Sequence, residues 1–160
     1  MAASVTPKPD LVEDYEKERG KPMPSFNHGV VQANLIIALS DACRDRFLIA
    51  SELSLASDPT MTPDISICNL RQPDWLHDEI RVAEAPLTTV EIVSPSQSIN
   101  DFVPRIEEYY RFGVRSVWLV QPPLKQVAVF TPDMDARVFV EGDVIDPTLD
   151  VRVALDKIFS

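Results

Sequence analysis

Two carboxylates beside short apolar segments are the residues in this sequence whose types could do chemistry. Asp64 directly precedes the apolar part of TPDISICN, and Glu91 lies inside TTVEIVSPS. An acid next to buried strands is costly unless something compensates its charge. Paired strands lie about 4.8 Å apart, so two such carboxylates could hold one hard divalent cation between them.

Each acid also has a purely structural interpretation. Asp64 follows Pro63 and could be an ordinary turn residue. Glu91 could lie at an exposed edge of the sheet. The two acids are 27 positions apart, and this separation is not diagnostic of a metal site, so both interpretations stay open on spacing alone.

Arg105 is the cationic residue best placed to join the two acids. It lies four residues after Asp101 and four before Tyr109, which puts all three on one face of a helix. That helix follows the strand of Glu91, so its positive N-terminal end would favour a phosphate near the acids. The alternative is a surface Asp101–Arg105 pair worth about 0.3–0.5 kcal/mol.

Two carboxylates, a cation and a divalent ion make a minimal phosphodiester hydrolase. The ion polarises the phosphate and lowers the pKa of a bound water, and the cation stabilises the developing negative charge. All-oxygen coordination favours Mg²⁺, with Mn²⁺ as an alternative. His28 and Gln121 are weaker candidates for lining such a site: His28 could be an ordinary exposed residue, and Gln121 could only close a turn.

Length and composition predict one domain over residues 1–160, with a loose N-terminal end at 1–10. The net charge of −10 argues against a general nucleic-acid binder, although a bound metal would bring positive charge to a nuclease site. No apolar segment is long enough to span a membrane, and Cys43 and Cys68 form no CxxC pair. We therefore expect a soluble cytoplasmic protein with two reduced thiols.

The remaining pattern indicates the elements that must position these residues. A helix with Asn27 as its N-cap is expected to run to about Arg44, and a second follows Asp101, with Pro104 in its first turn and Gly113 as its left-handed cap. Leu11–Arg19 could form a short surface helix, and 70–86 is expected to be a surface excursion. The expected strands are 47–56, 65–68, 88–93, 117–120, 127–130 and 138–140.

The segment 88–120 has an apolar strand at each end of a helix, which favours a parallel crossover. The last two strands are expected to pair, and the segment from Val144 onward closes the fold. The predicted fold class is therefore α/β, with a mixed central β-sheet flanked by helices.

Taken together, TPDISI, VEIVSPS, D-x3-R-x3-Y and GVRSVWLVQP resemble a restriction-endonuclease-like family common in bacteria, especially cyanobacteria. That family belongs to the PD-(D/E)XK phosphodiesterase superfamily. The early segment YEKERGK and the closing apolar segment fit it too, so the resemblance covers about residues 15–159. It implies a three-layer restriction-endonuclease-like fold, Asp64 and Glu91 as metal-binding acids, and Mg²⁺-dependent cleavage of DNA.

The chain departs from that pattern at three positions. Val93 occupies the place of the superfamily's lysine, Arg105 stands where the family moves that lysine onto the following helix, and Gln121 replaces a frequent aspartate. Arginine keeps the charge but does not give up a proton. Two hypotheses follow: a DNA endonuclease with Asp64, Glu91 and Arg105 as catalytic residues, or a catalytically degenerate nuclease-fold protein that binds a partner or forms a homodimer.

Overall fold

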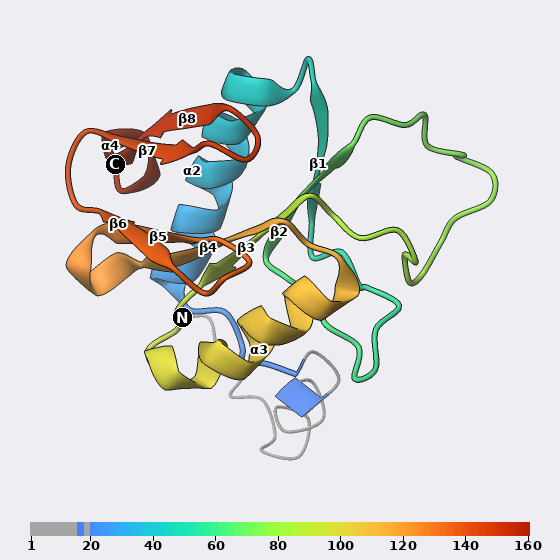
Figure 1. Ribbon diagram of the computed structural model, residues 1–160, viewed down its shortest axis with the longest axis horizontal. Coiled ribbons are helices and arrows are strands. Elements are labelled where there is room, and N and C mark those ends of the chain that lie inside the picture. Colours follow the sequence, from blue (N-terminus) through green and yellow to red (C-terminus); the bar gives the residue numbers. More distant parts are fainter. Residues whose placement is uncertain (1–15, 18–19) are drawn as a thin grey trace, which may run out of the picture.

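A six-stranded mixed sheet forms the centre of the computed structural model, which describes residues 16–17 and 20–160 (Figure 1). Its strands follow the order β1-β2-β3-β4-β5-β6. Their bounds are Phe47–Ser51, Ile65–Asn69, Thr88–Ile92, Ser116–Gln121, Gln126–Phe130 and Ala136–Phe139. The β3–β4 pair is parallel and the other neighbouring pairs are antiparallel, which confirms the mixed sheet and the crossover.

Two helices cover opposite faces of this sheet and complete the three layers (Figure 1). Helix α2 (Phe26–Cys43) packs Leu35 and Leu39 in one apolar cluster with alternate sheet residues such as Trp118. Helix α3 (Ile99–Phe112) packs its own apolar stripe against the intervening residues, including Leu119. This alternation follows the period of two in a strand, and it means that α3 covers the face to which Glu91 belongs.

A smaller unit of two strands and a short helix packs on the α2 side. It consists of β7 (Asp143–Asp146), β8 (Val151–Ala154) and α4 (Leu155–Ile158), whose apolar residues belong to the same cluster as α2. Buried Asp146 joins it to the central sheet, because its Oδ2 accepts hydrogen bonds from Ser116 Oγ at 2.6 Å and Trp118 Nε1 at 2.8 Å.

Both long helices begin earlier than the sequence pattern predicts. Ser25, not Asn27, caps α2, and its Oγ accepts the backbone N–H of His28 at 3.2 Å. Ser98 is the N-cap of α3, and Asp101 lies three residues inside, where its carboxylate accepts the Ser98 N–H at 2.8 Å. Pro104 therefore lies beyond the first turn, contrary to expectation.

Several local predictions are confirmed. Gly113 ends α3 with φ +117°, in the left-handed region that favours glycine. The segment 70–86 is largely exposed and extends away from the sheet (Figure 1). Both cysteines are free thiols. The strand expected at 47–56 is shorter, since β1 ends at Ser51, and β3 ends one residue before the expected position 93. A short 3₁₀ turn, η1 (Pro122–Leu124), follows β4.

Some expectations fall on parts of the chain outside the described residues. The loose N-terminal end at 1–10 lies there, and so does most of the expected helix 11–19, of which residues 16 and 17 are helical. Within 16–17 and 20–160, no helix has the length and apolar character that crossing a membrane requires.

Candidate active site

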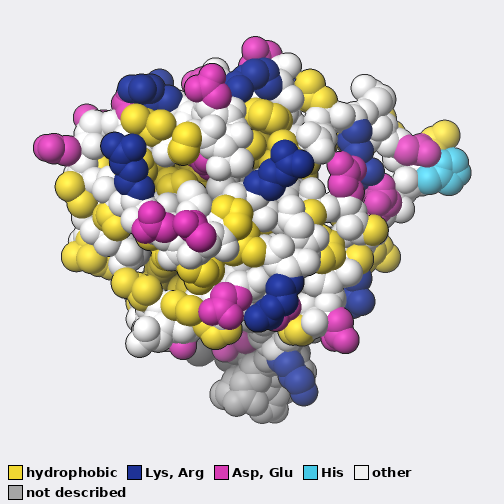
Figure 2. All heavy atoms as spheres, in the orientation of Figure 1, with side chains coloured by type: hydrophobic (Ala, Val, Ile, Leu, Met, Phe, Trp, Pro, Cys, Tyr) yellow, Lys and Arg dark blue, Asp and Glu magenta, His cyan; other side chains and the backbone are white. Residues whose placement is uncertain are grey.

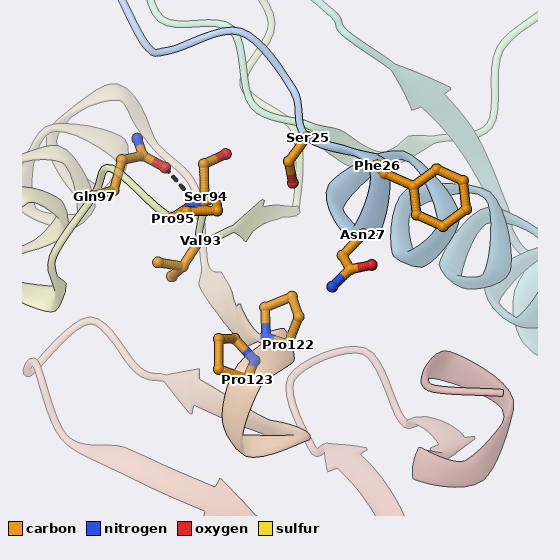
Figure 3. Close-up of a pocket in the computed structure, with 9 residues that line it drawn as sticks. All are labelled: Ser25, Phe26, Asn27, Val93, Ser94, Pro95, Gln97, Pro122 and Pro123. Carbon is orange, nitrogen blue, oxygen red and sulfur yellow. Dashed lines mark hydrogen bonds between the residues drawn. The ribbon is translucent and has the colours of Figure 1, made fainter.

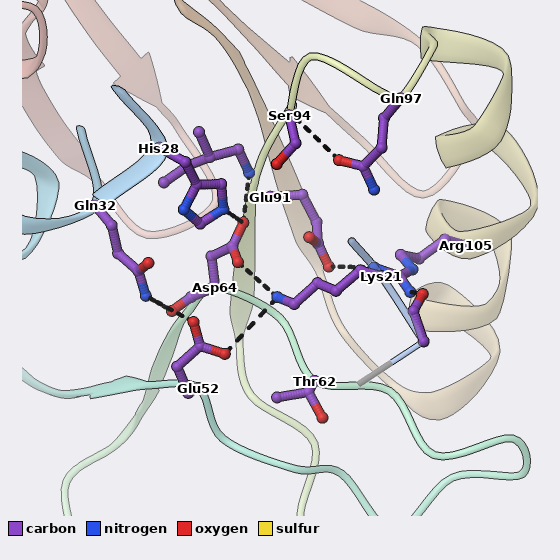
Figure 4. A network of polar contacts seen from close by, with 12 residues as sticks. Lys21, His28, Gln32, Glu52, Thr62, Asp64, Glu91, Ser94, Gln97 and Arg105 are labelled. Atoms are coloured by element: carbon purple, nitrogen blue, oxygen red, sulfur yellow. Dashed lines mark hydrogen bonds and ion pairs between the residues drawn. The ribbon is translucent and has the colours of Figure 1, made fainter. Parts of the chain in front are cut away.

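Strand pairing brings Asp64 and Glu91 together. β2 and β3 are antiparallel with Ile65 opposite Val90, so the next position of the register sets Asp64 opposite Glu91. Both side chains are buried, and Asp64 Oδ2 accepts the backbone N–H of Ile92 at 2.7 Å. Glu91 lies in an inner strand, not at an exposed edge of the sheet. The two acids therefore occupy one buried location (Figure 4).

Asp64 is surrounded by cationic or hydrogen-bonding partners. Lys21 Nζ lies 2.5 Å from its Oδ1, and His28 Nε2 lies 3.1 Å from its Oδ2, and both side chains are buried. Burial by itself raises the pKa of Asp64, but the hydrogen bond to His28 and the charge of Lys21 outweigh it and bring that pKa below its usual value. Asp64 is therefore held ionised.

Glu91 faces helix α3, and its pKa is shifted in the opposite direction to that of Asp64. Tyr109 Oη donates a short hydrogen bond to its Oε1, and Arg105 Nη1 lies 3.3 Å from the same oxygen. Burial, followed by the negative charge of Asp64, raises the pKa of Glu91 despite the opposing influence of Lys21, Arg105 and Tyr109. The two neighbouring acids therefore have pKa values shifted in opposite directions.

Arg105 joins the acid pair to the N-terminal segment. Its Nη2 donates to the backbone carbonyl of Gly20 at 2.7 Å, while its Nη1 contacts Glu91. Its predicted helix-face neighbour Tyr109 meets it at Glu91, as the four-residue spacing implies. Asp101 does not pair with Arg105 among the contacts of the described residues, because its carboxylate caps α3 instead.

Three residues that the sequence analysis did not select complete the arrangement: Lys21, Gln32 and Glu52 (Figure 4). Gln32 Nε2 donates to Glu52 Oε1 at 3.2 Å and to the Asp64 carbonyl at 2.9 Å. Glu52 directly follows β1 with a positive φ of 54°, and its Oε2 lies 3.9 Å from Lys21 Nζ. The only sequence signal was for Lys21, which ends the segment YEKERGK.

His28 and Gln121, the weaker candidates, lie in different surroundings. His28 is buried against Asp64, so the interpretation of His28 as an ordinary exposed residue is wrong. Gln121 ends β4 and pairs in register with Gln126. Within the described part of the chain, no hydrogen bond or ion pair joins Gln121 or Asp101 to either acid. Gln121 lies at the end of β4, and the Asp101 carboxylate caps the start of α3.

The donor set suits a hard cation that is shared with a substrate. The Lys21 ammonium already stands as a cation between Asp64 and Glu52 oxygens. Over residues 16–17 and 20–160, no three His, Cys, Asp or Glu side chains form a metal-binding group. Mg²⁺ commonly uses one or two carboxylates, with waters and substrate phosphates as its other ligands, so Asp64 and Glu91 fit it if Lys21 withdraws.

Comparisons with known proteins identify the family and the fold of this chain. The model of the Uma2 family, described as "Putative restriction endonuclease", matches residues 17–156. A crystal structure described as a putative nuclease belonging to DUF820, from Anabaena variabilis, superposes with a TM-score of 0.72. It shares 23% sequence identity, with 86% of this chain and 83% of that chain covered. No protein among those with curated descriptions matches this chain.

Proposed function

This chain belongs to the Uma2 family of restriction-endonuclease-like proteins, and from this premise we propose that it is a Mg²⁺-dependent DNA endonuclease. The observation that carries the proposal is the placement of two buried acids, Asp64 and Glu91, at opposed positions of paired strands. A protein that buries two carboxylates side by side loses free energy unless a cation compensates them. A divalent ion bound for function is such a cation.

Asp64 and Glu91 are the residues that would hold the ion. When bound, Mg²⁺ supplies Lewis-acid polarisation of the phosphate and a lowered pKa for a bound water. Asp64 is already ionised because of Lys21 and His28. The raised pKa of Glu91 makes a proton and the ion compete for this carboxylate, since metal ligands are bound in their deprotonated form.

Arg105 and Lys21 supply the positive charge that the scissile phosphate requires. Arg105 is partly accessible, with 16% of its side chain exposed, and its guanidinium points at Glu91. It can therefore stabilise developing negative charge but cannot act as a base. Lys21, from the N-terminal segment, contacts Asp64. We propose that its ammonium takes the place of the superfamily's lysine, whose position in this sequence is occupied by Val93.

Cleavage of supercoiled plasmid DNA with Mg²⁺ or Mn²⁺ tests the proposal. We expect the wild type to nick or linearise the plasmid, and Asp64→Asn and Glu91→Gln to lose about 100-fold or more of that rate. Glu107→Gln is the matched control, because Glu107 is a half-exposed acid on α3 that pairs with Arg111 at the surface. An inactive wild type, or full activity in the two acid variants, would overturn the proposal.

A second candidate function is a nuclease-fold protein that binds a partner, or forms a homodimer, without catalysis. Arg105 in place of a lysine and the net charge of −10 favour it. Arg105→Lys separates the two functions in the same plasmid assay. Cleavage that appears only in the lysine variant would support the degenerate protein, whereas an active wild type that loses activity in this variant would support the endonuclease.

A further inference from the structure

A cavity of about 370 Å³ lies between the start of α2 and the segment that follows β3 (Figure 3). Its walls are mainly apolar and come from three separated parts of the chain: Phe26, Val93, Pro95, Pro122 and Pro123. Its volume lies within the range of roughly 300–1,000 Å³ that small-molecule sites occupy.

This cavity adjoins the acid pair through two elements. Val93 and Ser94 directly follow β3, which carries Glu91, and Asn27 directly precedes His28, which contacts Asp64. Ser94 and Gln97 lie on the side of Glu91 and Arg105 in the view of the polar network (Figure 4). A nucleic-acid strand whose phosphate reaches the acids would therefore pass the mouth of the cavity.

The cavity combines flat apolar surfaces with amide groups. Gln97 Oε1 accepts the Ser94 backbone N–H at 3.0 Å, which fixes this side chain at the wall. Asn27 is exposed and points into the space between α2 and Pro122 (Figure 3). Phe26 stands at the rim with 84% of its side chain exposed, and its ring, which points away from the prolines in Figure 3, has to rotate to face a base in the cavity. A nucleobase has the matching chemistry, with two apolar faces and a polar edge that carboxamides can bind.

The charge of the chain leaves the affinity for a nucleic-acid strand to depend on contacts with its bases. With a net charge of −10, the protein has little capacity to gain affinity by neutralising many phosphates. The face shown in Figure 2 carries lysine and arginine side chains scattered among acidic ones, without a continuous basic patch. Stacking of a base on an aromatic side chain requires no positive charge and strengthens binding roughly 5- to 150-fold per base.

We propose that this cavity receives an unpaired nucleobase of the substrate strand, next to the phosphate at the acid pair. The inference rests on the proposed function and makes it more specific, because a duplex cannot insert a base without unpairing it. The preferred substrates are then single strands, flaps or frayed ends, with Phe26 as the stacking residue and Asn27 and Gln97 at the edge of the base.

The test is binding of a short oligonucleotide that carries one 2-aminopurine, free as a single strand or annealed as a duplex. Titrations use the full chain in Ca²⁺ and again in EDTA, so that no cleavage is required. We expect the single strand to bind at least about tenfold more tightly than the duplex, with a change in 2-aminopurine fluorescence. Phe26→Ala should lose about tenfold in single-strand affinity and leave duplex affinity unchanged.

Trp75→Ala is the matched control, since Trp75 is an aromatic side chain of similar exposure in the segment 70–86. It should bind both forms as the wild type does. Equal affinities for single strand and duplex, or an equal loss in both aromatic variants, would overturn the inference. If the protein cleaves plasmid but shows either of these two binding results, the base pocket alone is refuted. If it binds single strands as expected but cleaves no DNA, the endonuclease alone is refuted.

Discussion

Lys21 is the side chain that decides how the acid pair is neutralised when no divalent ion is bound. Its ammonium lies 2.5 Å from Asp64 and 3.9 Å from Glu52, and its side chain is 4% exposed. Mg²⁺ would compete for the same Asp64 oxygen. Lysine and metal ion are therefore alternative counterions of one buried carboxylate.

The Lys21→Met variant should be less stable than the wild type without Mg²⁺, because it leaves the buried Asp64 charge without its ammonium. Loss of one partner of a buried pair costs about 3–5 kcal/mol. Urea unfolding with and without Mg²⁺ measures the effect, and Mg²⁺ should restore more stability to the variant than to the wild type. Lys17→Met, at an exposed position, should change neither value. A variant as stable as the wild type without Mg²⁺ would contradict this role.

The pKa of Glu91 makes metal binding dependent on pH. Burial and the charge of Asp64 raise that pKa, so Glu91 takes up its proton at a higher pH than an ordinary glutamate. The proton and the metal compete for the carboxylate, and Mn²⁺ affinity should fall as the pH is lowered from about 8 to about 5. In Glu91→Gln, whose side chain does not titrate, the same titration series should be nearly flat. A wild-type affinity that is constant over this range would contradict the account.

Residue types and spacing selected Asp64, Glu91 and Arg105 as candidates, although each of them also had a structural interpretation. They could not identify Glu52 or Gln32, whose approach to Asp64 depends on how β1 and α2 pack on β2. The burial of His28 was equally out of reach, since the first turn of a helix is usually solvated. These contacts are tertiary, and no local pattern encodes them.

Among the helices and strands, the unit β3–α3–β4 was the easiest to predict. Its apolar strands, the four-residue spacing on α3 and Gly113 at its end are all local signals. The start of α3 was harder, because Ser98 and Asp101 both have side chains that favour helix caps. In the structure Ser98 is the N-cap, and Asp101 lies in the first turn, where its carboxylate accepts the Ser98 backbone N–H.

The end of α3 should tolerate no side chain at Gly113. Its φ is +117°, and an added Cβ would lie 3.2 Å from Ala85 Cβ. We expect Gly113→Ala to lower the free energy of unfolding by about 1–2 kcal/mol. Gly29→Ala is the opposite case, because Gly29 is inside α2 with nothing within 4 Å of the added Cβ. This variant should raise the free energy of unfolding by about 0.5–1 kcal/mol. Chemical denaturation of both variants checks the pair, and equal shifts would refute it.

For the chain as a whole, the layered α/β architecture followed from the order of elements, whereas the attachment of β7 and β8 did not. These strands are short, and their link to the central sheet is made by buried Asp146, which accepts from Ser116 and Trp118. A buried acid late in the sequence gave no hint of those partners. Only the assembled fold shows that this carboxylate joins the two sheets.

Asp146→Ala should therefore be strongly destabilising. It leaves the buried Trp118 Nε1–H without its acceptor, at about 1–3 kcal/mol, and removes one hydrogen bond of Ser116 Oγ, which keeps its contact with Thr88 Oγ1. Asp143→Ala in the same strand is the control, since the Asp143–Arg152 pair is 3.4 Å long and solvent-accessible, and should cost less than about 1 kcal/mol. Thermal and urea unfolding compare them. A similar cost in both variants would show that Asp146 does not anchor the small sheet.

Isothermal titration of Mn²⁺ and Mg²⁺ into wild type and Asp64→Asn tests most directly whether the two opposed acids, Asp64 and Glu91, form a cation site. The variant keeps the size of the side chain but removes the charge that Lys21 and His28 hold in place. We predict one binding site in the wild type and an affinity at least about tenfold weaker in Asp64→Asn. Equal affinities in the two proteins would contradict the metal site and, with it, the endonuclease.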